Sequence, residues 1–466
     1  MDNKYDVIIV GAGPSGIFCA YKLITKNKNL KIAIFELGNS IENRICPKRI
    51  TGVCSNCKIC NITTGFSGAG AFSDGKLSLS TDVGGNLKDI LGQDKALKYI
   101  KESDSIYLSF GADSKIYGEN EQELISKVKL KAIQAGLKLV ESPVRHLGTE
   151  EGYKIYSKLQ SFLIDNGVKI YFNTRVIDYL INDNRVVGVL TENNISYYSN
   201  YIVSGVGRVG CESLSNLCRQ HNINSVVGTV DIGVRVEVRN EILEELNNSL
   251  YEAKLIYRTP TFDDKVRTFC VNPSGEVTTE YYEGGLAVVN GHAYKAKDLK
   301  TENTNFALLV SKNFTEPFNT PIEYGKSIAR LSNMLCGGKI MVQTFGDFLK
   351  GRRTTKERLY RNNIIPTLKD SVPGDLSLVL PYRIMKDIEE TIFALDKISP
   401  GIASVETLLY GVEVKFYSNK IITNENFETN INGLFVMGDG AGITRGLQQA
   451  SANGLCVADY ILSRFN

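Results

Sequence analysis

The sequence predicts an α/β protein in which a Rossmann-like dinucleotide-binding domain is combined with a second, α+β domain. Three observations lead to this fold class. The chain opens with a strand, a glycine-rich turn, a helix and a second strand. Near the other end, residues 433–442 form a buried apolar run followed by another glycine-rich turn. Between them, residues 230–238 alternate apolar and polar side chains, which is typical of an antiparallel sheet.

The N-terminal stretch carries a dinucleotide-binding fingerprint. Residues 5–10 are apolar and β-branched, like a buried strand, and residues 17–26 have the pattern of a helix. The turn between them fits G-x-G-x-x-G, whose glycines permit the turn, let a pyrophosphate approach the backbone and allow close helix–strand packing. Residues 31–35 form a second strand that ends on an acid, which accepts hydrogen bonds from a ribose 2′-hydroxyl and repels a 2′-phosphate. FAD or NAD is therefore expected rather than NADP, on Gly11, Ala12, Gly13, Pro14, Ser15, Gly16 and Glu36.

The composition is that of an ordinary globular protein. The chain has 466 residues, 43% of them hydrophobic and 23% charged, and this length allows a large core. A net charge of +3 gives no reason to expect a nucleic-acid partner. No signal-peptide core precedes the first strand and no apolar run approaches the ~20 residues of a membrane span, so we expect a cytoplasmic protein with no membrane partner. In that compartment the ten cysteines are expected to be thiols, metal ligands or redox groups.

A second glycine-rich stretch, residues 65–76, is expected to lie against the same ligand, because small residues let a backbone approach closely. The alternative is a flexible loop. The residues expected to contact the cofactor here are Ser67, Gly68, Ala69 and Gly70. Residues 86–110 and 119–135 have the apolar spacing of helices, and a further helix is expected from Thr149 to about Asn166.

A set of alternating strands follows, and it ends on a second literal G-x-G-x-x-G at residues 205–210. The predicted strands are 168–172, 175–181, 186–191 and 201–204. The second motif permits two interpretations, a separate NAD site or a turn that closes over the first nucleotide. We favour the second interpretation, because the motif ends a meander and does not open a new βαβ unit. Val176, Gly205 and Gly207 are accordingly predicted to bind the cofactor.

The C-terminal turn is the second strong indication of a nucleotide site. In Gly438-Asp439-Gly440-Ala441-Gly442 the carboxylate follows a buried strand, where it can accept hydrogen bonds from a polyol such as the ribityl chain of a flavin. A helix is expected from Leu447 to Phe465, and its first N–H groups can face the N1/O2 edge of a flavin. NAD sites need no such second half, so FAD is favoured, with Gly438, Asp439, Gly446, Leu447 and Gln448 among its contacts.

These stretches together resemble the FAD-binding domain of the glutathione-reductase superfamily in its two-domain form. More narrowly, the chain is similar to a bacterial family known as FAD-dependent, or NAD(FAD)-utilising, dehydrogenases. The residues that carry this resemblance are 65–76, 269–275, 289–291, 343–349 and 411–413. That family usually has Gly-Glu-Gly-Ala-Gly at the position of residues 438–442. This chain has Asp439 in place of the glutamate, and it also supplies a carboxylate. The resemblance implies fold and cofactor, and it leaves the substrate open.

The predicted domains are discontinuous. Residues 1–85, 141–228 and 401–466 are expected to form the FAD-binding domain. Residues 86–140 are expected to form a helical segment, and residues 229–400 a substrate domain of mixed sheet and helices that includes helices at 321–336 and 383–396.

A cysteine cluster follows the first acidic strand end, with C-x2-C-x2-C spacing and one further cysteine before it. The spacing resembles the first three ligands of a bacterial [4Fe–4S] run, and four thiolates also suit zinc. A redox dithiol and ordinary free thiols are the other interpretations. The candidate metal ligands are Cys46, Cys54, Cys57 and Cys60.

Lys76 and Arg208 are the predicted catalytic residues. Each is a cation in a glycine-rich stretch expected to line the flavin, and a cation near N1 or N5 favours hydride acceptance. His146 is a weaker candidate acid or base, with a structural role as the alternative. Arg352-Arg353 either hold an anionic substrate or are solvated.

We therefore expect a FAD-dependent oxidoreductase, a dehydrogenase or reductase, that transfers hydride between flavin N5 and a small organic substrate. A flavin monooxygenase is the alternative within the same class. A flavin-bearing redox sensor that uses the cysteine cluster is the alternative of another class. The electron donor or acceptor is left open between NADH and a ferredoxin-like protein.

Overall fold

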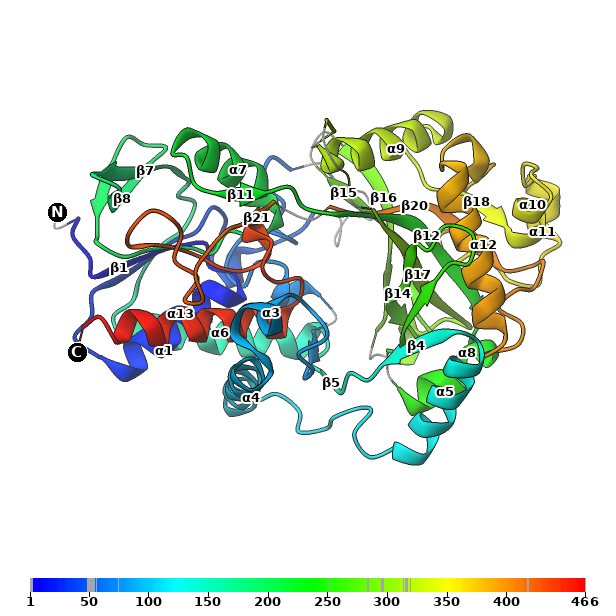
Figure 1. Cartoon of the computed structure of the whole chain (residues 1–466), viewed down its shortest axis with the longest axis horizontal. Coiled ribbons are helices and arrows are strands. Elements are labelled where there is room, and N and C mark those ends of the chain that lie inside the picture. The colour runs from blue at the N-terminus through cyan, green and yellow to red at the C-terminus, as the bar shows by residue number, and fades with distance from the viewer. Residues whose placement is uncertain are drawn as a thin grey trace. The chain divides into compact units, whose positions relative to one another are not determined.

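The chain divides into two compact units, each with its own core (Figure 1). The computed structural model describes residues 3–47, 55, 57–73, 75–250, 252–282, 285–294, 297–312, 314, 317–318, 320–416 and 419–465. Unit 1 comprises Met1–Lys115, Arg145–Gly228 and Tyr417–Asn466. Unit 2 comprises Ile116–Val144 and Thr229–Phe416.

Unit 1 is built on a five-stranded parallel sheet. Its strands, in spatial order, are β22 (Leu434–Val436), β10 (Ile202–Ser204), β1 (Val7–Val10), β2 (Ile32–Phe35) and β6 (Lys169–Tyr171). Ile9 at the centre faces Val203 on one side and Ile34 on the other. The four strands from β22 to β2 are buried along their whole length, which is expected where helices cover both faces of a parallel sheet.

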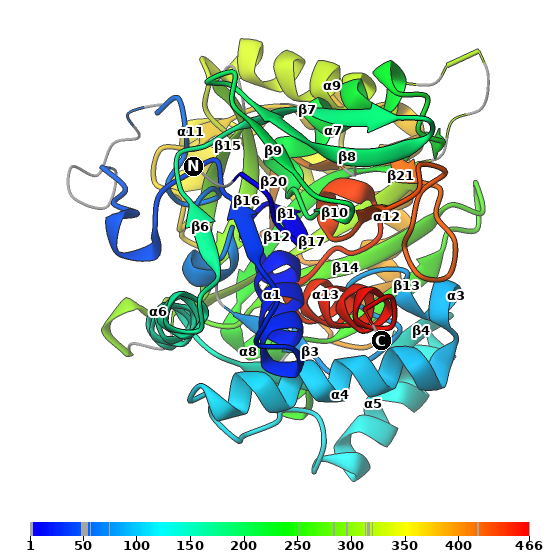
Figure 2. The ribbon, with the colours of Figure 1, turned by 90° about the vertical axis from the view of Figure 1, so that its left-hand side faces the viewer.

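Helices from both ends of the chain pack together in unit 1. In Figure 2, α1 (Pro14–Lys26) and α13 (Leu447–Leu462) lie side by side below β1. A side chain at Gly454 of α13 would place its Cβ 2.1 Å from the carbonyl oxygen of Ser15, so these helices touch backbone to backbone. The other helices among the described residues of the unit are α3 (Leu87–Leu91), α4 (Gln93–Ser109), α6 (Thr149–Asp165) and α7 (Cys211–Gln220).

Shorter elements complete unit 1. A three-stranded meander is formed by β7 (Val176–Asn182), β8 (Arg185–Thr191) and β9 (Ser196–Tyr198). The two-stranded pairings are β3 (Lys76–Ser78) with β5 (Val144–His146) and β11 (Ser225–Val226) with β21 (Lys420–Ile421). The short 3₁₀ turns are η1 (Ile41–Asn43), η2 (Gly70–Phe72), η3 (Arg208–Gly210) and η7 (Asp439–Ala441).

Unit 2 is built on an eight-stranded sheet whose pairings are antiparallel except between β18 and β19. In spatial order the strands are β19 (Val372–Pro373), β18 (Met341–Thr344), β20 (Leu408–Phe416), β12 (Val230–Arg239), β17 (Asn303–Lys312), β14 (Lys265–Asn272), β13 (Lys254–Arg258) and β4 (Leu137–Val140). A separate hairpin is formed by β15 (Glu276–Tyr282) and β16 (Leu286–His292). The helices are α5 (Gln122–Gln134), α8 (Asn240–Ser249), α9 (Pro321–Cys336), α10 (Phe345–Leu349), α11 (Lys356–Tyr360) and α12 (Tyr382–Asp396).

Both faces of β12 are buried, the one with apolar side chains and the one with polar side chains. The predicted antiparallel strand is present, but Asp231, Arg235 and Glu237 on its polar face are at most 1% exposed. Arg235 lies opposite Tyr410 of β20, and Tyr410 packs in an apolar cluster with residues of the β15–β16 hairpin. The polar side chains of β12 therefore need partners inside the protein.

Several sequence-predicted elements are confirmed, with local differences. Helices α5, α6, α9, α12 and α13 lie in the predicted stretches, whereas the predicted helix 86–110 is divided between α3 and α4. The break falls at Gly92, whose φ of +79° is not helical. The predicted segment 86–140 is shared between the two units, and unit 2 extends to Phe416 where the prediction ended at residue 400, because β20 pairs with β12.

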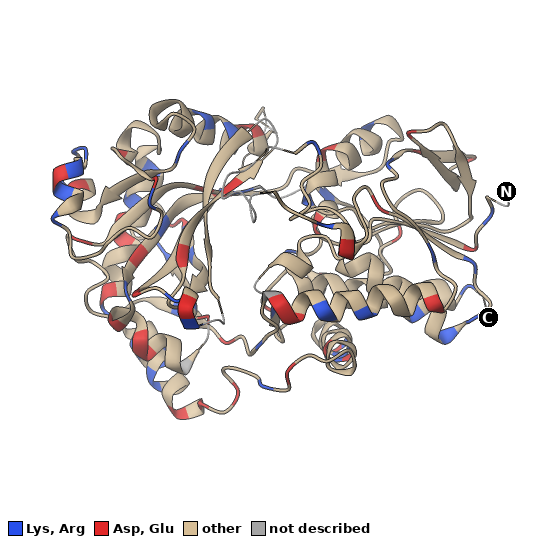
Figure 3. Ribbon diagram, turned by 180° about the vertical axis from the view of Figure 1, so that it is seen from behind, with Lys and Arg blue, Asp and Glu red and all other residues tan. Residues whose placement is uncertain are grey.

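Charged residues are interspersed on both units. Figure 3 shows Lys and Arg as well as Asp and Glu distributed over both units. None of the described helices combines the length and apolarity needed to cross a membrane.

Candidate functional site

The three glycines of the first turn have the three different environments that the motif requires. Gly11 has φ +101°, and a Cβ there would lie 2.6 Å from the carbonyl oxygen of Gly205. A Cβ on Gly16 would lie 2.1 Å from the carbonyl oxygen of Gly11, so the helix packs directly on the turn. A Cβ on Gly13 would meet nothing within 4 Å. The turn is therefore closed where strand and helix meet, and open at its middle glycine.

Glu36 connects three loops at the end of β2. Its carboxylate accepts backbone hydrogen bonds from Ala12 at 2.8 Å, Gly38 at 2.9 Å and Gly65 at 3.0 Å, and the residue is 5% exposed. A carboxylate offers about four acceptor positions, so capacity for one ribose hydroxyl remains on Oε2, which accepts from Ala12. Glu36 is thus an architectural residue as well as the predicted ribose ligand.

The loop 65–72 packs on the first turn. The backbone N–H of Ser67 donates to the carbonyl oxygen of Ala12 at 2.8 Å, and a Cβ on Gly68 would lie 3.5 Å from the Cα of Gly13. Ala69 precedes the 3₁₀ turn that begins at Gly70. The loop is therefore fixed against the glycine turn.

Arg44 fixes this loop through hydrogen bonds. It was not identified from the sequence. Its guanidinium donates to the carbonyl oxygens of Asn61, Ile62 and Phe66 and to Ser67 Oγ at 2.5–2.9 Å, and the residue is 4% exposed. The same group lies 4.6 Å from the ring centroid of Phe72. No local signal marks such an arginine, because its acceptors are backbone groups that any sequence supplies.

The ends of β1, β10 and β22 meet beside the glycine turn. Gly205 donates from its N–H to the carbonyl oxygen of Val10 at 2.8 Å, and Gly440 donates to that of Val206 at 3.0 Å. Gly438 has φ +80°, and a Cβ there would lie 2.9 Å from Ser15 Oγ. The second G-x-G-x-x-G thus lies against the first, although the two are almost two hundred residues apart. Gly207 is open, since a Cβ there would meet nothing within 4 Å.

Asp439 and Arg208 form an ion pair. Arg208 Nε lies 3.2 Å from Asp439 Oδ2, and Thr444 Oγ1 donates to Asp439 Oδ1 at 2.8 Å. The side chain of Arg208 is 45% exposed and that of Asp439 is 21% exposed. A predicted catalytic residue therefore contacts a predicted cofactor-binding residue.

The first turn of α13 presents its backbone to the same edge, whereas one predicted side chain points elsewhere. Gly446 is the N-cap residue, and half-buried Leu447 begins the helix. Gln448 Nε2 donates to the carbonyl oxygen of Ile100 at 2.7 Å and to Ser103 Oγ at 3.0 Å, so this side chain faces α4. The predicted contact between Gln448 and the cofactor stays a prediction.

Two further predicted residues lie at strand starts. Lys76 begins β3 and is half-buried. Val176 begins β7 opposite Thr191. The N–H of Thr174 donates to the carbonyl oxygen of Glu36 at 2.9 Å, so Val176 follows directly on a residue that contacts the end of β2.

Of the four predicted metal ligands, Cys46, Cys57 and Cys60 are described, and Cys54 lies outside the described residues. Cys57 and Cys60 are exposed thiols, and the carbonyl oxygen of Cys60 accepts from the N–H groups of Thr63 and Thr64. Among the described residues no group of three or more His, Cys, Asp or Glu side chains is arranged to hold a metal ion. The metal ligand set stays a prediction.

A buried polar cluster lies in unit 2 around Arg235 and Glu413. Arg235 donates from Nε and Nη2 to the two carboxylate oxygens of Glu413, each at 2.8 Å, and from Nη1 to Asn305 Oδ1 at 2.8 Å. Asn272 Nδ2 donates to the same Asn305 oxygen at 3.1 Å. A Cβ on Gly291 would lie within 2.2–2.5 Å of Asn305, Arg235 and Asn272. Three motif stretches, 269–275, 289–291 and 411–413, thus meet at one point.

The Arg352-Arg353 pair is engaged by the protein itself. Arg352 Nε donates to Asp347 Oδ1 at 2.6 Å, and Arg358 Nε donates to Oδ2 at 2.9 Å. Burial alone raises the pKa of Asp347, but these hydrogen bonds outweigh it and hold the pKa below its usual value. Arg353 donates weakly to the carbonyl oxygen of Pro373 at 3.4 Å. These contacts give both arginines a structural role.

Two acids and two cations form a second network in unit 2. Asp264 is paired with Lys312 and Arg383, and Lys312 Nζ lies 3.5 Å from Asp387 Oδ2. Burial, followed by the neighbouring Asp264 carboxyl, raises the pKa of Asp387 to about 6. Burial opposes ionisation of Asp264 as well, but hydrogen bonds from Arg383 and Lys312 lower its pKa to about 2. Protons on this pair therefore reside on Asp387.

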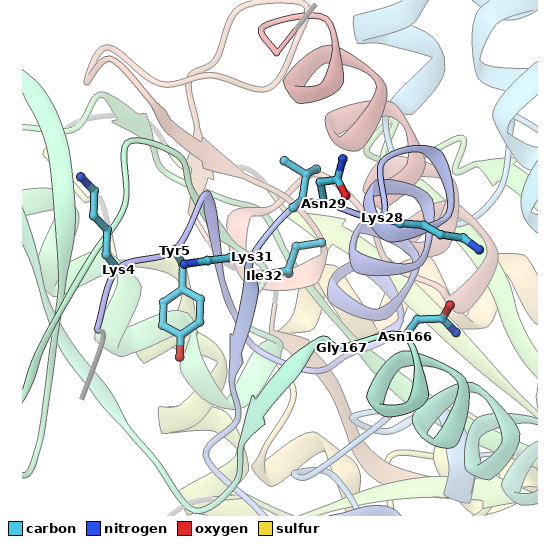
Figure 4. A pocket seen from close by; sticks show the side chains of 9 residues that line it. Lys4, Tyr5, Lys28, Asn29, Lys31, Ile32, Asn166 and Gly167 are labelled. Carbon is cyan, nitrogen blue, oxygen red and sulfur yellow. The ribbon is translucent and has the colours of Figure 1, made fainter.

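A pocket of about 390 Å³ lies at the amino ends of strands in the unit 1 sheet, the edge opposite to the glycine turn (Figure 4). It is lined by Lys4, Tyr5, Lys28, Asn29, Leu30, Lys31, Ile32, Asn166 and Gly167. Tyr5 and Lys31 lie at the amino ends of β1 and β2, whereas ligands of open α/β sheets bind at the carboxyl ends.

Comparison with known proteins gives partial matches. Residues 229–416 match the family described as "FAD-dependent protein, C-terminal domain-like", and residues 3–44 match the Thi4 family. A protein of Clostridium beijerinckii described as uncharacterized is 26% identical over 481 residues, which covers 98% of this chain and 81% of that one.

Three solved enzyme structures are similar to this chain, each with a TM-score below 0.5. Quinol fumarate reductase FrdA of E. coli is 14% identical, with 99% of this chain and 70% of that chain covered and a TM-score of 0.42. L-proline dehydrogenase of P. horikoshii is 10% identical, with 100% and 95% covered and a TM-score of 0.41. Glycine oxidase of Geobacillus kaustophilus is 13% identical, with 99% and 95% covered and a TM-score of 0.39. These scores are too low to support an inference about function.

Two further residues that shape the site were missed from sequence. Asn453 Oδ1 accepts from the N–H of Gly438 at 3.0 Å, and the side chain is fully buried. Gln449 Nε2 donates to the carbonyl oxygens of Thr81 and Val83, and its Oε1 accepts from Leu87. Both lie on α13. Asn453 holds the turn 15 residues before it, whereas Gln449 holds a loop that lies 366 residues or more away in the sequence.

Proposed function

We propose that the chain is a FAD-dependent oxidoreductase that acts on a small organic substrate, and that unit 1 is a flavin domain of the glutathione-reductase type. The observation that carries this proposal is the meeting of five features at one edge of the parallel sheet. They are the Gly11–Gly16 turn, Glu36, the loop 65–72, the Gly438–Asp439 turn and the first turn of α13. The match of residues 229–416 to the C-terminal domain of FAD-dependent proteins supports the same cofactor.

The residues at this edge fit a dinucleotide. The open face of Gly13 gives a pyrophosphate access to the backbone at the start of α1, whose first N–H groups attract anions. Glu36 retains acceptor capacity for a ribose hydroxyl. Asp439 is partly exposed and can accept a hydrogen bond from a polyol. Ser67 to Gly70 would close the pyrophosphate side, because this loop touches Ala12 and Gly13.

The role of the protein is to orient and tune the cofactor. When bound, FAD supplies the hydride chemistry at its N5 atom. The N–H groups of the first turn of α13 have no partners inside the helix and stabilise negative charge placed beside them. Lys76 is proposed as a cation that acts in the same sense. The proposed electron donor or acceptor is NADH or a ferredoxin-like protein. The rate of flavin reduction or reoxidation with each of them distinguishes the two.

The test is the absorption spectrum of the purified protein, with the cofactor released and separated by chromatography. We expect two flavin bands, a released cofactor that co-elutes with FAD, and bleaching under anaerobic NADH or dithionite. Metal analysis of the same sample tests for iron or zinc at Cys46 to Cys60. An iron–sulfur cluster there would also add a broad shoulder to the absorption spectrum. Protein that contains no flavin, and takes up none when FAD is added, would overturn the proposal.

A further inference from the structure

The motif stretch 343–349 supports a strongly basic segment of unit 2. This segment, residues 350–361, follows α10 and includes α11, and we call it the basic loop. It contains six Lys and Arg residues and one acid, Glu357, so its net charge is +5. Since the whole chain carries +3, all the other residues together carry −2. The low net charge of the chain therefore conceals one concentrated positive segment.

Asp347 fixes the conformation of the basic loop. Its carboxylate accepts hydrogen bonds from Arg352 Nε at 2.6 Å, Arg358 Nε at 2.9 Å and Thr354 Oγ1 at 2.8 Å. The amide of Gln343, from the same motif stretch, donates to the carbonyl oxygen of Arg352 at 2.9 Å. The loop thus closes on one buried carboxylate, and the motif residues hold it in a compact form.

Three cations of the basic loop have no carboxylate partner among the described residues. Lys350, Lys356 and Arg361 are exposed, and none of them forms an ion pair with another described side chain. Arg361 donates to the carbonyl oxygen of Glu357 at 3.3 Å. In Figure 1, α10 and α11 lie at the edge of unit 2, beyond β18. The charge of these three side chains is therefore available to an anionic partner.

Exposed apolar side chains accompany these cations. Tyr360 is 91% exposed and follows Lys356 by four residues, which places both on one face of α11. Leu349, directly before the loop, is 41% exposed, and Ile365, four residues after it, is 63% exposed. The carbonyl oxygen of Ile365 accepts from Asn303 Nδ2 at 2.9 Å, so the backbone here is held by β17. The basic loop thus combines positive charge with an aromatic ring and two flanking aliphatic side chains.

We propose that the basic loop binds the surface of an anionic lipid bilayer. Negative headgroups attract clustered Lys and Arg, while neighbouring aromatic and aliphatic side chains enter the interface beneath the headgroups. A single-stranded nucleic acid would contact the cations and stack on Tyr360, but it offers no site for the two aliphatic side chains. An acidic protein is favoured less, because lysine supplies two of the three unpaired cations and is depleted in protein–protein interfaces.

This inference goes beyond the proposed function and does not depend on it. The expectation of no membrane partner rested on the lack of an apolar run long enough to span a bilayer. Binding at the surface of a bilayer needs no such run.

The first experiment uses the whole chain with Tyr360→Trp as a reporter. The sequence contains no tryptophan, so the indole of this variant is the single one in the chain and lies in the basic loop. We expect its emission to shift to the blue with vesicles of phosphatidylcholine and phosphatidylglycerol in equal parts, because the ring leaves water. Vesicles of phosphatidylcholine alone should cause no shift, and added salt should weaken the effect.

Cosedimentation with the same vesicles measures the contribution of the charges. A triple variant with Lys350→Gln, Lys356→Gln and Arg361→Gln should bind anionic vesicles about a hundredfold more weakly, since each cation near such a surface contributes a factor of about five.

A matched control removes three exposed cations elsewhere. Lys88, Lys127 and Lys154 are exposed, and each is paired with an acid outside the basic loop. Their replacement by Gln lowers the net charge by the same amount, and this variant should bind vesicles as the unmodified protein does. Thermal midpoints of both triple variants show whether they are folded.

The outcomes decide between the possible partners. A blue shift with anionic vesicles, together with weaker binding of the loop variant alone, supports the inference. No binding to anionic vesicles would overturn it, and so would equal loss in the two triple variants, because net charge alone would then explain the binding. Protein that ignores the vesicles but binds poly(U) RNA or poly-L-glutamate would assign the loop to a nucleic acid or an acidic protein instead.

Discussion

Arg235 and Glu413 form a two-point ion pair inside unit 2, with both N···O distances at 2.8 Å and neither side chain exposed to solvent. Their strands, β12 and β20, are neighbours in the sheet, although the two residues are 178 positions apart. The pair is supported by Lys415, whose Nζ lies 3.2 Å from Glu413 Oε1.

Removing the charge of Glu413 should destabilise unit 2 strongly. Glu413→Gln leaves Arg235 buried without its carboxylate, and breaking a buried pair in this way costs about 3–5 kcal/mol. The free energy of unfolding in urea measures the loss. The control is Glu123→Gln in the same unit, since the Glu123–Lys127 pair is exposed and such pairs contribute little to stability. Equal effects of the two variants would show that the buried pair is not a determinant of stability.

Gly291→Ala should destabilise the same cluster. The added Cβ would lie 2.2 Å from Asn305 Oδ1 and 2.4 Å from Arg235 Nη1, so a bonded network would have to move. Overpacking of this kind costs about 1–3 kcal/mol. The comparison is Gly152→Ala in α6, where the nearest atom is 3.8 Å away and alanine is favoured by about 1 kcal/mol. Thermal midpoints moving in opposite directions are expected; a stable Gly291→Ala would contradict the close packing.

Gly13→Ala should separate cofactor binding from folding. The space beside Gly13 is open, so the apoprotein should keep its thermal midpoint, while the methyl group should obstruct the pyrophosphate and weaken FAD by tenfold or more. Gly16→Ala should instead lower the thermal midpoint of the apoprotein. Its Cβ would lie 2.1 Å from the carbonyl oxygen of Gly11, so the helix could not pack on the turn. Fluorescence titration with FAD and thermal melting of the apoproteins test both. If Gly13→Ala bound FAD as tightly as the unmodified protein, the pyrophosphate does not lie there.

The Asp264–Asp387 network should give unit 2 a defined pH dependence. The pKa of Asp387 is raised to about 6, so between about pH 4 and pH 6 the folded chain holds a proton that the unfolded chain has released. This contribution to stability therefore falls as the pH rises through that window. The pKa of Asp264 is lowered to about 2, and its contribution is lost only as the pH falls below about 4.

Asp387→Asn tests this sign. Because the asparagine does not titrate, the free energy of unfolding of the variant, relative to that of the unmodified protein, should rise between pH 4 and pH 7 by an amount on the order of 2 kcal/mol. Urea unfolding across this range measures it. A constant difference, or one that shrinks with pH, would contradict the raised pKa.

The sequence predicted the parts of the fold that local patterns encode. The glycine turn with its flanking strands and helix is one contiguous stretch, so its conformation follows from the local sequence pattern. The alternation of β12 predicted an antiparallel strand correctly, yet it could not show that Arg235 and Glu237 are buried, because their partners come from elsewhere in the chain.

The candidate site was predictable in its backbone and less so in its side chains. Gly11, Gly16 and Gly205 lie against one another as the motif implies. The direction of Gln448 toward α4 depends on Ile100, which no periodicity identifies as a neighbour. The spacing of the cysteines predicts no single conformation, because thiols at that spacing can be metal ligands, a redox dithiol or free thiols.

The pairing of α1 with α13 has a consequence for synthesis of the protein. β22 and α13 follow the last residue of unit 2, whereas β1, β2, β6 and β10 all precede β12. Unit 2 lies entirely within the intervening residues, so all of its strands are made before the sheet of unit 1 is complete. The sheet edge that carries the Gly11–Gly16 turn is therefore completed only after all of unit 2 has been synthesised, because the Asp439 turn and α13 follow unit 2 in the chain.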